Sequence, residues 1–252
     1  MSALGDFSGR IAFVTGAGTG IGAATATELG ARGASVALMG RHAESLEKVA
    51  ATICADGGTG KALVLVGDVA KPEDVESAIR NTVATFGALH LAVNNAGVDG
   101  GTAKLAEISV DSWYDTIGTN LSGVFFGLKY QIPAIIAAGG GAIVNVSSVF
   151  SDRGLSQHAP YTASKHGVHG LTRAAAHDYA SAGVRINELL PGVIDTPMLD
   201  SNRGMVEQMK AFIPQHRLGQ PVEVARVICF LLSDAASYMT GARVSVDGGF
   251  LI

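Results

Sequence analysis

The sequence predicts a doubly wound α/β fold, in which helices cover both faces of a parallel β-sheet. Short apolar runs rich in β-branched residues, such as 10–14 and 142–146, alternate with longer stretches of helical periodicity. A glycine-rich loop, 15–22, follows the first run and opens the first helical stretch. The 252 residues suffice for one large core, so we expect a single domain over 1–252.

The predicted elements alternate between strand and helix along the whole chain. Strands are expected at 10–14, 35–39, 61–66, 89–93, 142–146, 184–190 and 243–246. Helices are expected from the glycine loop to about residue 33, over 43–55, 72–86, 111–138 and 161–182, and from Pro221 onward. Strand–helix–strand units with right-handed crossovers build parallel sheets, so the strands are expected to be parallel.

The composition argues against several classes of function. The net charge of −4 gives no basic surface for nucleic acid or anionic lipid, and no uninterrupted apolar run reaches membrane-spanning length. Residues 1–9 lack the basic and apolar parts of an export signal, so a cytoplasmic protein is expected. Cys54 and Cys229 lie in apolar patterns and are predicted to be core thiols. His166 and His169 lack converging carboxylates or cysteines, so no metal site is expected.

The loop Thr15–Gly22 is the candidate site for a dinucleotide. It joins a predicted strand to a predicted helix, where glycines let the backbone approach a pyrophosphate and the helix N-terminus stabilises its charge. The spacing is G-x-x-x-G-x-G, not the commoner G-x-G-x-x-G, so a purely structural glycine turn is the alternative. The residues expected at the cofactor here are Gly16, Gly18, Thr19, Gly20, Ile21 and Gly22.

Arg41 follows the second predicted strand, where an acidic residue would hold the ribose 2′-hydroxyl of NAD. The sequence has no acid at this place. Arg41 can instead pair with the additional phosphate of NADP, which makes NADP(H) the favoured coenzyme and NAD(H) the alternative. A solvated arginine at a helix start is the structural interpretation of the same residue.

Two further strand ends carry candidate cofactor contacts. Asp68 and Val69 follow the third strand, where the acid can accept from the adenine amino group or cap the next helix. Asn95, Ala96 and Gly97 follow the fourth strand, and small and amide residues suit close packing against a flat cofactor.

The candidate chemistry lies in the stretch 142–165. Tyr161 and Lys165 are four residues apart on a predicted helix and share one face. A nearby ammonium would lower the pKa of Tyr161 from about 10 towards neutrality, which suits proton exchange with a substrate. A hydroxyl of Ser147 or Ser148, at the preceding strand end, can polarise the same substrate oxygen. A buried aromatic beside a solvated lysine is the alternative.

Seven motifs in order resemble the short-chain dehydrogenase/reductase family over the whole chain. They are Thr15-Gly16-x-x-x-Gly20-x-Gly22, Asn94-Asn95-Ala96-Gly97, Asn120, Ser148, Tyr161-x-x-x-Lys165, Pro191-Gly192 and Val246-Asp247-Gly248-Gly249. The family pattern places its serine thirteen residues before the tyrosine, which selects Ser148 over Ser147. The resemblance implies a Rossmann-like, seven-stranded sheet of order 3-2-1-4-5-6-7 and hydride exchange between a nicotinamide and a carbonyl or alcohol.

The resemblance also implies roles for single residues. Tyr161 would donate the proton in reduction and accept it in oxidation, Lys165 would hold the nicotinamide ribose, and Ser148 would orient the substrate oxygen. Asn120, whose surroundings by themselves predict only a helix kink or a polar task, would anchor a water leading to Lys165. At the end of the sixth strand the implied cofactor residues are Pro191, Gly192, Ile194 and Thr196, with the Ile194 backbone and the Thr196 hydroxyl on the carboxamide.

The substrate is expected to be apolar, bulky and uncharged. Residues 197–215 carry apolar side chains between two prolines and are predicted to form a lid, with a short surface helix pair as the alternative. Asp99, Asp152 and Arg153 weaken this expectation, because they can face the same cleft. Besides Ser148 and Tyr161, the predicted substrate residues are Leu155, His158, Val193, Met198, Leu199 and Met205, although His158 can instead cap a helix.

The chain is expected to form a homotetramer. Away from its reactive face the Tyr161 helix carries small residues, and the predicted helix 111–138 is apolar over much of its circumference. Two-fold pairing of these helices with their copies would bury both faces. A second contact at the apolar end of the chain, 244–252, would give 222 symmetry, as the resemblance also implies. Packing of the helices on their own lid and loops is the alternative.

The favoured function is therefore an NADP(H)-dependent carbonyl reductase or alcohol dehydrogenase that interconverts a small-molecule ketone and its secondary alcohol. The alternatives are an NAD-dependent dehydrogenase of a cyclic alcohol or diol, a 3-oxoacyl-carrier-protein reductase, and a non-catalytic dinucleotide-sensing module. A module of that kind would be expected to lose Tyr161 or Lys165, and this chain retains both.

Overall fold

Seven parallel strands form one sheet in the order β3-β2-β1-β4-β5-β6-β7, in a computed structural model that describes residues 6–55 and 61–252. All seven predicted strands are present, and their order agrees with the one that the resemblance implies. The direction of winding changes between β1 and β4, so a ligand is expected at the carboxyl ends of these two strands. The strands are β1 (Ile11–Thr15), β2 (Ser35–Gly40), β3 (Ala62–Val66), β4 (Leu91–Asn94), β5 (Gly141–Val146), β6 (Val184–Pro191) and β7 (Arg243–Val246).

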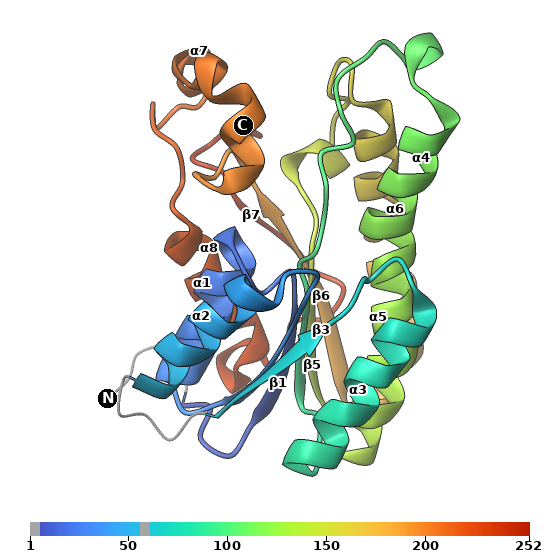
Figure 1. Cartoon of the computed structure of the whole chain (residues 1–252), viewed down its shortest axis with the longest axis vertical. Coiled ribbons are helices and arrows are strands. Elements are labelled where there is room, and N and C mark those ends of the chain that lie inside the picture. The colour runs from blue at the N-terminus through green and yellow to red at the C-terminus, as the bar shows by residue number, and fades with distance from the viewer. Residues whose placement is uncertain (1–5, 56–60) are drawn as a thin grey trace.

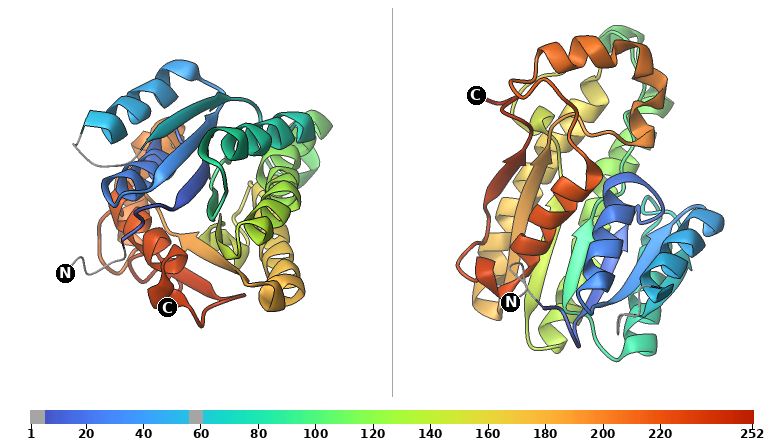
Figure 2. Two further views of the ribbon diagram at one scale, coloured as in Figure 1. Left: turned by 90° about the horizontal axis from the view of Figure 1, so that it is seen from below. Right: turned by 90° about the vertical axis from the view of Figure 1, so that its left-hand side faces the viewer.

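Helices cover both faces of the sheet (Figure 1). One face is covered by α1 (Gly20–Ala31), α2 (Ala43–Ala55) and α8 (Pro221–Leu232). The other is covered by α3 (Pro72–Phe86), α5 (Gly123–Ala137) and α6 (Ala159–Tyr179). Two shorter helices are α4 (Val110–Ile117) and α7 (Val206–Ala211). The segment that carries α7 stands above the carboxyl ends of β6 and β7 (Figure 2), where it can reach a ligand bound at the sheet.

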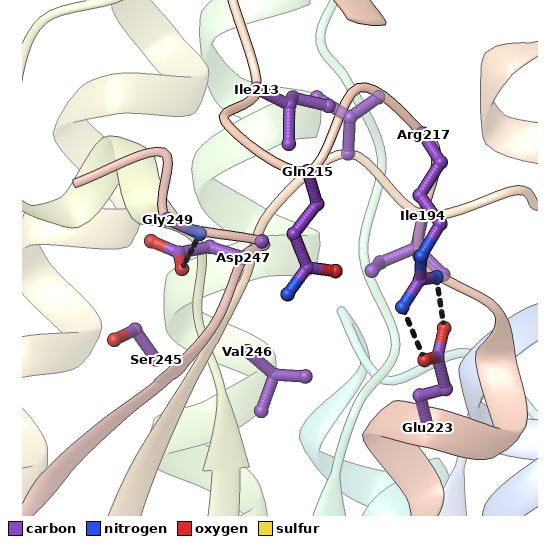
Figure 3. A pocket seen from close by; sticks show the side chains of 12 residues that line it. Ile194, Ile213, Gln215, Arg217, Glu223, Ser245, Val246, Asp247 and Gly249 are labelled. Atoms are coloured by element: carbon purple, nitrogen blue, oxygen red, sulfur yellow. Dashed lines mark hydrogen bonds and ion pairs between the residues drawn. The ribbon is translucent and has the colours of Figure 1, made fainter. Parts of the chain in front are cut away.

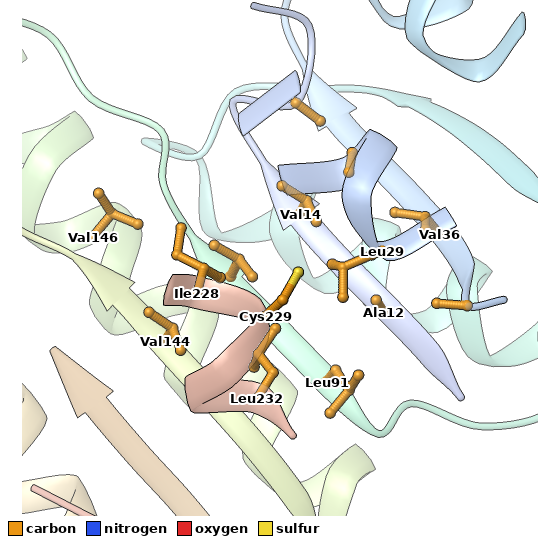
Figure 4. Packing of buried hydrophobic residues seen from close by; sticks show 14 of the residues in the cluster. Ala12, Val14, Leu29, Val36, Leu91, Val144, Val146, Ile228, Cys229 and Leu232 are labelled. Atoms are coloured by element: carbon orange, nitrogen blue, oxygen red, sulfur yellow. The ribbon is translucent and has the colours of Figure 1, made fainter. Parts of the chain in front are cut away.

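Alternate side chains of β1 enter two apolar clusters, one on each face of the sheet. Ala12 and Val14 join the cluster beneath α1 and α8, whereas Ile11 and Phe13 join the cluster beneath α3, α5 and α6. All five residues of β1 are buried, as a parallel strand with helices on both faces requires. Figure 4 shows the first cluster, with α8 laid against the strands.

The two cysteines lie in different environments, which corrects the expectation of two core thiols. Cys229 is buried in α8, and burial raises the pKa of its thiol to about 12. Cys54 is exposed. The apolar pattern near Cys54 belongs to the buried stripe of α2, formed by Leu46, Val49 and Ile53, and Cys54 follows Ile53 on a neighbouring, solvent-facing position.

The helix predicted over 111–138 is interrupted by one π-helical turn. α4 ends at Ile117, the π-turn spans Gly118–Ser122, and α5 continues from Gly123. Asn120 lies in this turn and is fully buried. The flanking glycines weaken the α-helix, and a π-turn changes the direction of the side chains that it carries, often at a functional site.

The described residues also bear on membranes and metals. None of their helices is long and apolar enough to cross a bilayer. They contain no group of three or more His, Cys, Asp or Glu side chains that could hold a metal ion. The expectation about an export signal concerns residues 1–9, of which 1–5 lie outside the described residues.

Candidate active site

The glycine loop folds into a cradle that only glycines can form. Gly16 and Gly20 have left-handed backbones, with φ of +63° and +55°. A Cβ at Gly22 would overlap the carbonyl oxygen of Gly16, and one at Gly18 would overlap the Ser45 hydroxyl. The loop therefore presents bare backbone at the amino end of α1.

The amino end of α1 fits a pyrophosphate. Thr19, its N-cap residue, makes no side-chain cap hydrogen bond with any described residue. The first-turn amides, including those of Ile21 and Gly22, therefore keep their N–H donors for a ligand. These donors and the helix dipole favour an anion. Thr196 approaches from the other side, since a Cβ at Gly20 would lie 3.1 Å from its Cγ2. The residues present thus fit dinucleotide phosphates.

Thr15 and Asn95 join this loop to the end of β4. The Thr15 hydroxyl oxygen accepts from the backbone N–H groups of Asn95 (2.9 Å) and Ala96 (3.1 Å). The Asn95 amide donates to the carbonyl oxygens of Thr15 (3.0 Å) and Gly16 (3.3 Å). The Asn95 side chain, predicted at the cofactor, therefore holds the cradle in shape.

Three predicted cofactor residues lie at the ends of β2 and β3. Arg41 is exposed and has no hydrogen-bond or ion-pair partner among the described residues. The Asp68 carboxylate accepts from the Ala70 N–H (3.0 Å) and forms a local turn, whereas Lys71 is the N-cap of α3. Val69 is buried in the cluster beneath α5. Of the three, Arg41 has its side chain free for a ligand.

Ser148 and Tyr161 meet at the carboxyl end of β5. Ser148 lies two residues after the end of β5, and its side chain hydrogen-bonds Tyr161 in the first turn of α6. Its hydroxyl also accepts from the Phe150 N–H (3.2 Å). Ser147, the alternative serine, instead donates to the carbonyl oxygen of Lys165 (3.3 Å). The structure thus places Ser148, not Ser147, beside the tyrosine hydroxyl.

Lys165 lies one turn after Tyr161 on the same face of α6. Only 4% of its surface is exposed, and its Nζ donates to the Val146 carbonyl (3.2 Å). The same nitrogen lies 5.5 Å from the centroid of the Tyr161 ring. A Cβ at Gly97 would lie 3.6 Å from it, so the end of β4 borders the lysine.

The Asn120 side chain is bound to neighbouring groups of the chain. Its Oδ1 accepts from the Val98 N–H (2.8 Å), and its Nδ2 donates to the Val98 carbonyl (2.9 Å) and to the Ser164 hydroxyl (3.2 Å). Ser164 in turn donates to the Tyr161 carbonyl (2.7 Å). Asn120 therefore fixes the segment after β4 against the first turns of α6.

Burial changes the protonation of both reactive side chains. It raises the pKa of Tyr161, the Ser148 hydrogen bond opposes the rise, and the negative charge of Asp99 adds to it. Burial also lowers the pKa of Lys165 to about 8, against the charge of Glu188. The spacing predicts a lowered pKa for Tyr161, and the structure shows a raised one, because residue spacing carries no information about the cost of burying a phenolate.

The segment after β6 carries the four remaining cofactor candidates. Pro191 is the last residue of β6. A Cβ at Gly192 would lie 2.7 Å from the Cα of Asp247, so this close crossing of the chain requires glycine. Ile194 is buried, and Thr196 contacts the glycine loop. One short segment therefore connects the end of β7 with the cradle.

His158 lies at the N-cap of α6, but its ring makes no cap hydrogen bond with the described residues. Its Nδ1 contacts the Ser156 carbonyl (2.9 Å) and its Nε2 contacts the Thr102 hydroxyl (3.2 Å). His158 therefore links two loops near Tyr161. Leu155, from the same loop, is half-buried.

The predicted lid consists of a 3₁₀ segment, Pro197–Met205, and the short helix α7. The side chains of 201–203 lie outside the described residues. Met198 is 44% exposed, Met205 50% and Phe212 76%, while Leu199 is half-buried. The segment is thus helical, as the alternative of a short surface helix pair predicts, and it presents apolar side chains to solvent, as a lid would.

Three charged residues were candidates for the same cleft. Asp152 pairs with Arg243 (2.9 Å), and the Arg153 guanidinium lies 5.2 Å from the Phe250 ring centroid. Asp99 acts on the pKa of Tyr161. Only Asp99 of the three therefore bears on the reactive tyrosine.

A cavity of about 310 Å³ lies between the end of β7, the start of α8 and residues 213–219 (Figure 3). Val193 and Ile194 line it, together with the Arg217–Glu223 ion pair (2.8 Å). Ser148 and Tyr161 are not among its lining residues. Val193, predicted as a substrate wall, therefore faces a space that the reactive pair does not share.

Sequence reasoning missed two residues around the site. Ser164 stands between Tyr161 and Lys165, and nothing in its spacing marked it as a partner of Asn120. Glu188 is fully buried and acts on the pKa of Lys165. The sequence does contain a sign of Glu188: it places a carboxylate next to the apolar residues that end the predicted buried strand 184–190, where charged side chains are rare.

Comparison with known proteins places the chain among dehydrogenases. Residues 16–251 match a family model described as enoyl-(acyl carrier protein) reductase. The chain is 46% identical to cyclohexanol dehydrogenase from Acinetobacter sp. (strain SE19), over 97% of this chain and 96% of that one. It is 42% identical to 2,5-dichloro-2,5-cyclohexadiene-1,4-diol dehydrogenase from Sphingobium indicum (strain DSM 16412 / CCM 7286 / MTCC 6364 / B90A), over 98% and 99%. A crystal structure of a short-chain type dehydrogenase/reductase from Mycobacterium marinum matches with a TM-score of 0.94 at 33% identity, covering 98% of each chain.

Proposed function

Because the chain belongs to the short-chain dehydrogenase/reductase family, we propose that it interconverts a cyclic secondary alcohol and its ketone. The chain is an oxidoreductase of a secondary alcohol or ketone that uses NAD or NADP. That the substrate is cyclic is the more specific part of the proposal. It is supported by relatives named for cyclohexanol and a cyclohexadiene-diol. The observation that carries the proposal is the meeting of Ser148, Tyr161 and Lys165 beside Gly97 and the glycine cradle.

Tyr161 exchanges a proton with the substrate oxygen, and Ser148 orients and polarises that oxygen. When bound, the nicotinamide supplies or accepts the hydride, and its oxidised form adds a positive charge. The raised pKa keeps Tyr161 protonated and ready to donate in reduction. In oxidation the Ser148 hydrogen bond and the Lys165 ammonium stabilise the phenolate.

Lys165 holds the nicotinamide ribose and supplies charge near Tyr161. With a pKa of about 8, most of it is protonated at neutral pH. The Asn120 side chain is already bound to Val98 and Ser164. We therefore propose that the main-chain carbonyl of Asn120, in the π-turn, binds the water through which protons reach Lys165.

NADP(H) is the coenzyme that we propose as favoured. Arg41 lies exposed at the end of β2, and a guanidinium can bind a phosphate through two parallel hydrogen bonds. Thr19 provides no second basic group in the loop, so the preference is moderate. The remaining contacts are those predicted from the glycine loop and from the segment after β6.

The substrate-binding surface combines an apolar cover with one acid. The exposed Met198 and Met205 supply flexible, polarisable contacts for a ring, and Leu155, His158 and Leu199 complete the proposed walls. Val193 faces the separate cavity beside β7. Asp99, close enough to act on Tyr161, offers an acceptor for the second hydroxyl group of a ring diol.

A homotetramer is proposed for the assembly. An apolar groove between α5 and α6 is lined by Leu121, Ser122, Phe125, Phe126, Gly167 and Leu171, and Phe125 is 47% exposed. A two-fold contact between copies would cover this groove, and the exposed Ile252 at the chain end suits a second contact. A cytoplasmic location remains part of the proposal, on the sequence argument alone.

Initial rates with NAD(H) and NADP(H), measured for cyclic and acyclic alcohols and ketones, test the function. We expect turnover of six-membered ring alcohols, and a loss of about 10²–10⁴-fold in the folded Tyr161→Phe variant, which lacks the proton donor. A strong preference for a small keto acid would overturn the substrate class, and near-normal turnover in Tyr161→Phe would overturn the mechanism. Coenzyme binding without turnover of any carbonyl would instead support a dinucleotide sensor.

A further inference from the structure

Two charged side chains are buried among the described residues, and their charges are opposite. Lys165 on α6 is 4% exposed and Glu188 on β6 is 0% exposed, whereas the other buried polar side chains there are uncharged. Burial of a charge is costly unless opposite charge or hydrogen bonds compensate it. Lys165 belongs to the active site, whereas the reaction as proposed above gives no role to Glu188.

The Glu188 carboxylate is held on one side only. Its Oε2 lies 2.7 Å from His169 Nδ1 and 3.3 Å from Arg243 Nε. Its Oε1 is buried and has no hydrogen-bond partner among the described residues. No hydrogen-bond donor of the described residues therefore screens the negative charge on this side of the carboxylate, and its electrostatic effect on nearby groups is stronger.

Glu188 and Lys165 share the α6 side of the sheet. His169, which contacts the carboxylate, lies one helical turn after Lys165. Lys165 Nζ donates to the carbonyl of Val146 on β5, and β5 pairs with β6 so that Asn145 is opposite Glu188. The cation and the anion thus lie on two elements that pack against each other, the helix α6 and the strand β6.

The groups that face Glu188 come from each element packed against it. α6 contributes Lys165 and His169, and β7 contributes Arg243, which also pairs with Asp152 in the turn after Ser148. β5 contributes the neutral Asn145. Lys165 is the one cation of this set that makes no ion pair with a carboxylate of the described residues, so it depends on charge at longer range.

We propose that Glu188 is a positioning residue for the reaction: held by His169 and Arg243, its buried carboxylate keeps Lys165 in the ammonium form. This inference rests on the proposed function, in which that ammonium stabilises the Tyr161 phenolate. The pKa of Lys165, lowered to about 8 by burial, is supported by the charge of Glu188. Without that charge, Lys165 would lose its proton at a lower pH.

The first test is the pH profile of kcat/KM for oxidation of cyclohexanol in the Glu188→Gln variant, which keeps the shape and removes the charge. We expect its alkaline limb to move to lower pH by about one pH unit, so that activity at pH 9 relative to pH 7 falls about fivefold. Glu188→Asp, which keeps the charge, should restore part of the limb. An unshifted limb in Glu188→Gln would overturn the proposal.

Variants of the two residues that hold Glu188 add to this test, because each should affect the pH of the alkaline limb differently. Arg243→Gln removes a counter-charge of Glu188, so its alkaline limb should move to higher pH. Because Arg243 lies on the edge strand and is partly exposed, this variant decides the question if Glu188→Gln does not fold. His169→Gln keeps a donor for Oε2 and should leave the limb in place. A shift to lower pH in Arg243→Gln would contradict the proposed role.

The second test needs no substrate and compares the unfolding free energy of His169→Gln with that of His169→Gln/Glu188→Gln. The pKa of Lys165 is lower in the folded protein than in the unfolded chain. The contribution of Lys165 to the unfolding free energy therefore decreases as the pH falls from 10.5 to about 8, and it is constant below pH 8. Without Glu188 the loss should continue below pH 8, and the difference between the two proteins should grow there. A constant difference would overturn the proposal, even if a wild type inactive on ring alcohols had already refuted the proposed function.

Discussion

The glycine cradle (residues 15–22 with 94–97) and the proposed substrate cover (residues 197–215) are built in different ways. The cradle is bare backbone in left-handed and closely crossing conformations, tied together by the Thr15 and Asn95 hydrogen bonds. The cover is short helical turns that leave Met198, Met205 and Phe212 between 44% and 76% exposed. The cradle is held by contacts within the chain, whereas the cover leaves several apolar side chains exposed, although Ile213 is buried.

This difference is the one expected if the cradle binds a dinucleotide and the cover binds the substrate, as proposed. A dinucleotide has constant phosphates, so a rigid set of backbone donors at a helix N-terminus suits it. Substrates within one enzyme family vary, and flexible thioether side chains can adapt their contacts to different rings. The cradle should therefore tolerate almost no added atoms, whereas the cover should tolerate substitution with small, substrate-dependent effects.

Substitution of Gly22 by Ala should break the cradle and have the largest effect. The added methyl would overlap the Gly16 carbonyl oxygen and approach the Asn95 amide. We expect the unfolding free energy to fall by about 1–3 kcal/mol, and the Kd for NADPH, measured by fluorescence titration, to rise at least ~10-fold. Gly154→Ala is the matched control, because a Cβ there meets nothing within 4 Å. If Gly154→Ala changed the unfolding free energy and the Kd as much as Gly22→Ala, the cradle would not be the rigid part of the molecule that the comparison describes.

Most of the fold could be predicted from the sequence because its signals are local. A run such as 142–146 is too short and too rich in β-branched residues for a helix, and helix starts such as Pro72 and Pro221 carry their own first-turn signal. The π-turn at Asn120 could not be placed, because it depends on contacts with Val98 and Ser164 that only the folded chain creates.

The candidate site could be predicted only where it depends on spacing. Tyr161 and Lys165 share a helix face by position alone, and the structure brings Ser148 to them. The raised pKa of Tyr161 and the burial of Glu188 are properties of the environment, which the sequence does not display. His169, examined as a metal ligand in the sequence, contacts Glu188, which lies on a different element.

The coenzyme preference should depend on one exposed side chain, that of Arg41, in addition to the backbone of the cradle. Arg41→Ala should lower kcat/KM for NADPH by about 10–100-fold, equivalent to ~1.5–3 kcal/mol for a lost charge-assisted contact. Values for NADH should stay unchanged, because NADH lacks the additional phosphate. The neighbouring His42→Ala is the control, since His42 is also exposed. Equal losses with both coenzymes, or equal wild-type kcat/KM for both, would refute NADP(H) as the favoured coenzyme.

Met205→Ala in the cover should give the smallest effect and the clearest contrast with Gly22. Half of the Met205 surface is exposed, so its removal should change the unfolding free energy by less than about 0.5 kcal/mol. If Met205 closes over a bound ring, kcat/KM for cyclohexanol should fall about 3–10-fold, since a lost apolar contact is worth ~1 kcal/mol, while kcat/KM for 2-propanol should change less. Tyr238→Ser is the control, because Tyr238 is fully exposed just before β7, at the opposite end of the strands from Tyr161. Equal losses for both alcohols would show that Met205 supports the fold of the segment and does not contact the ring, and the cover would then have to be assigned to other residues.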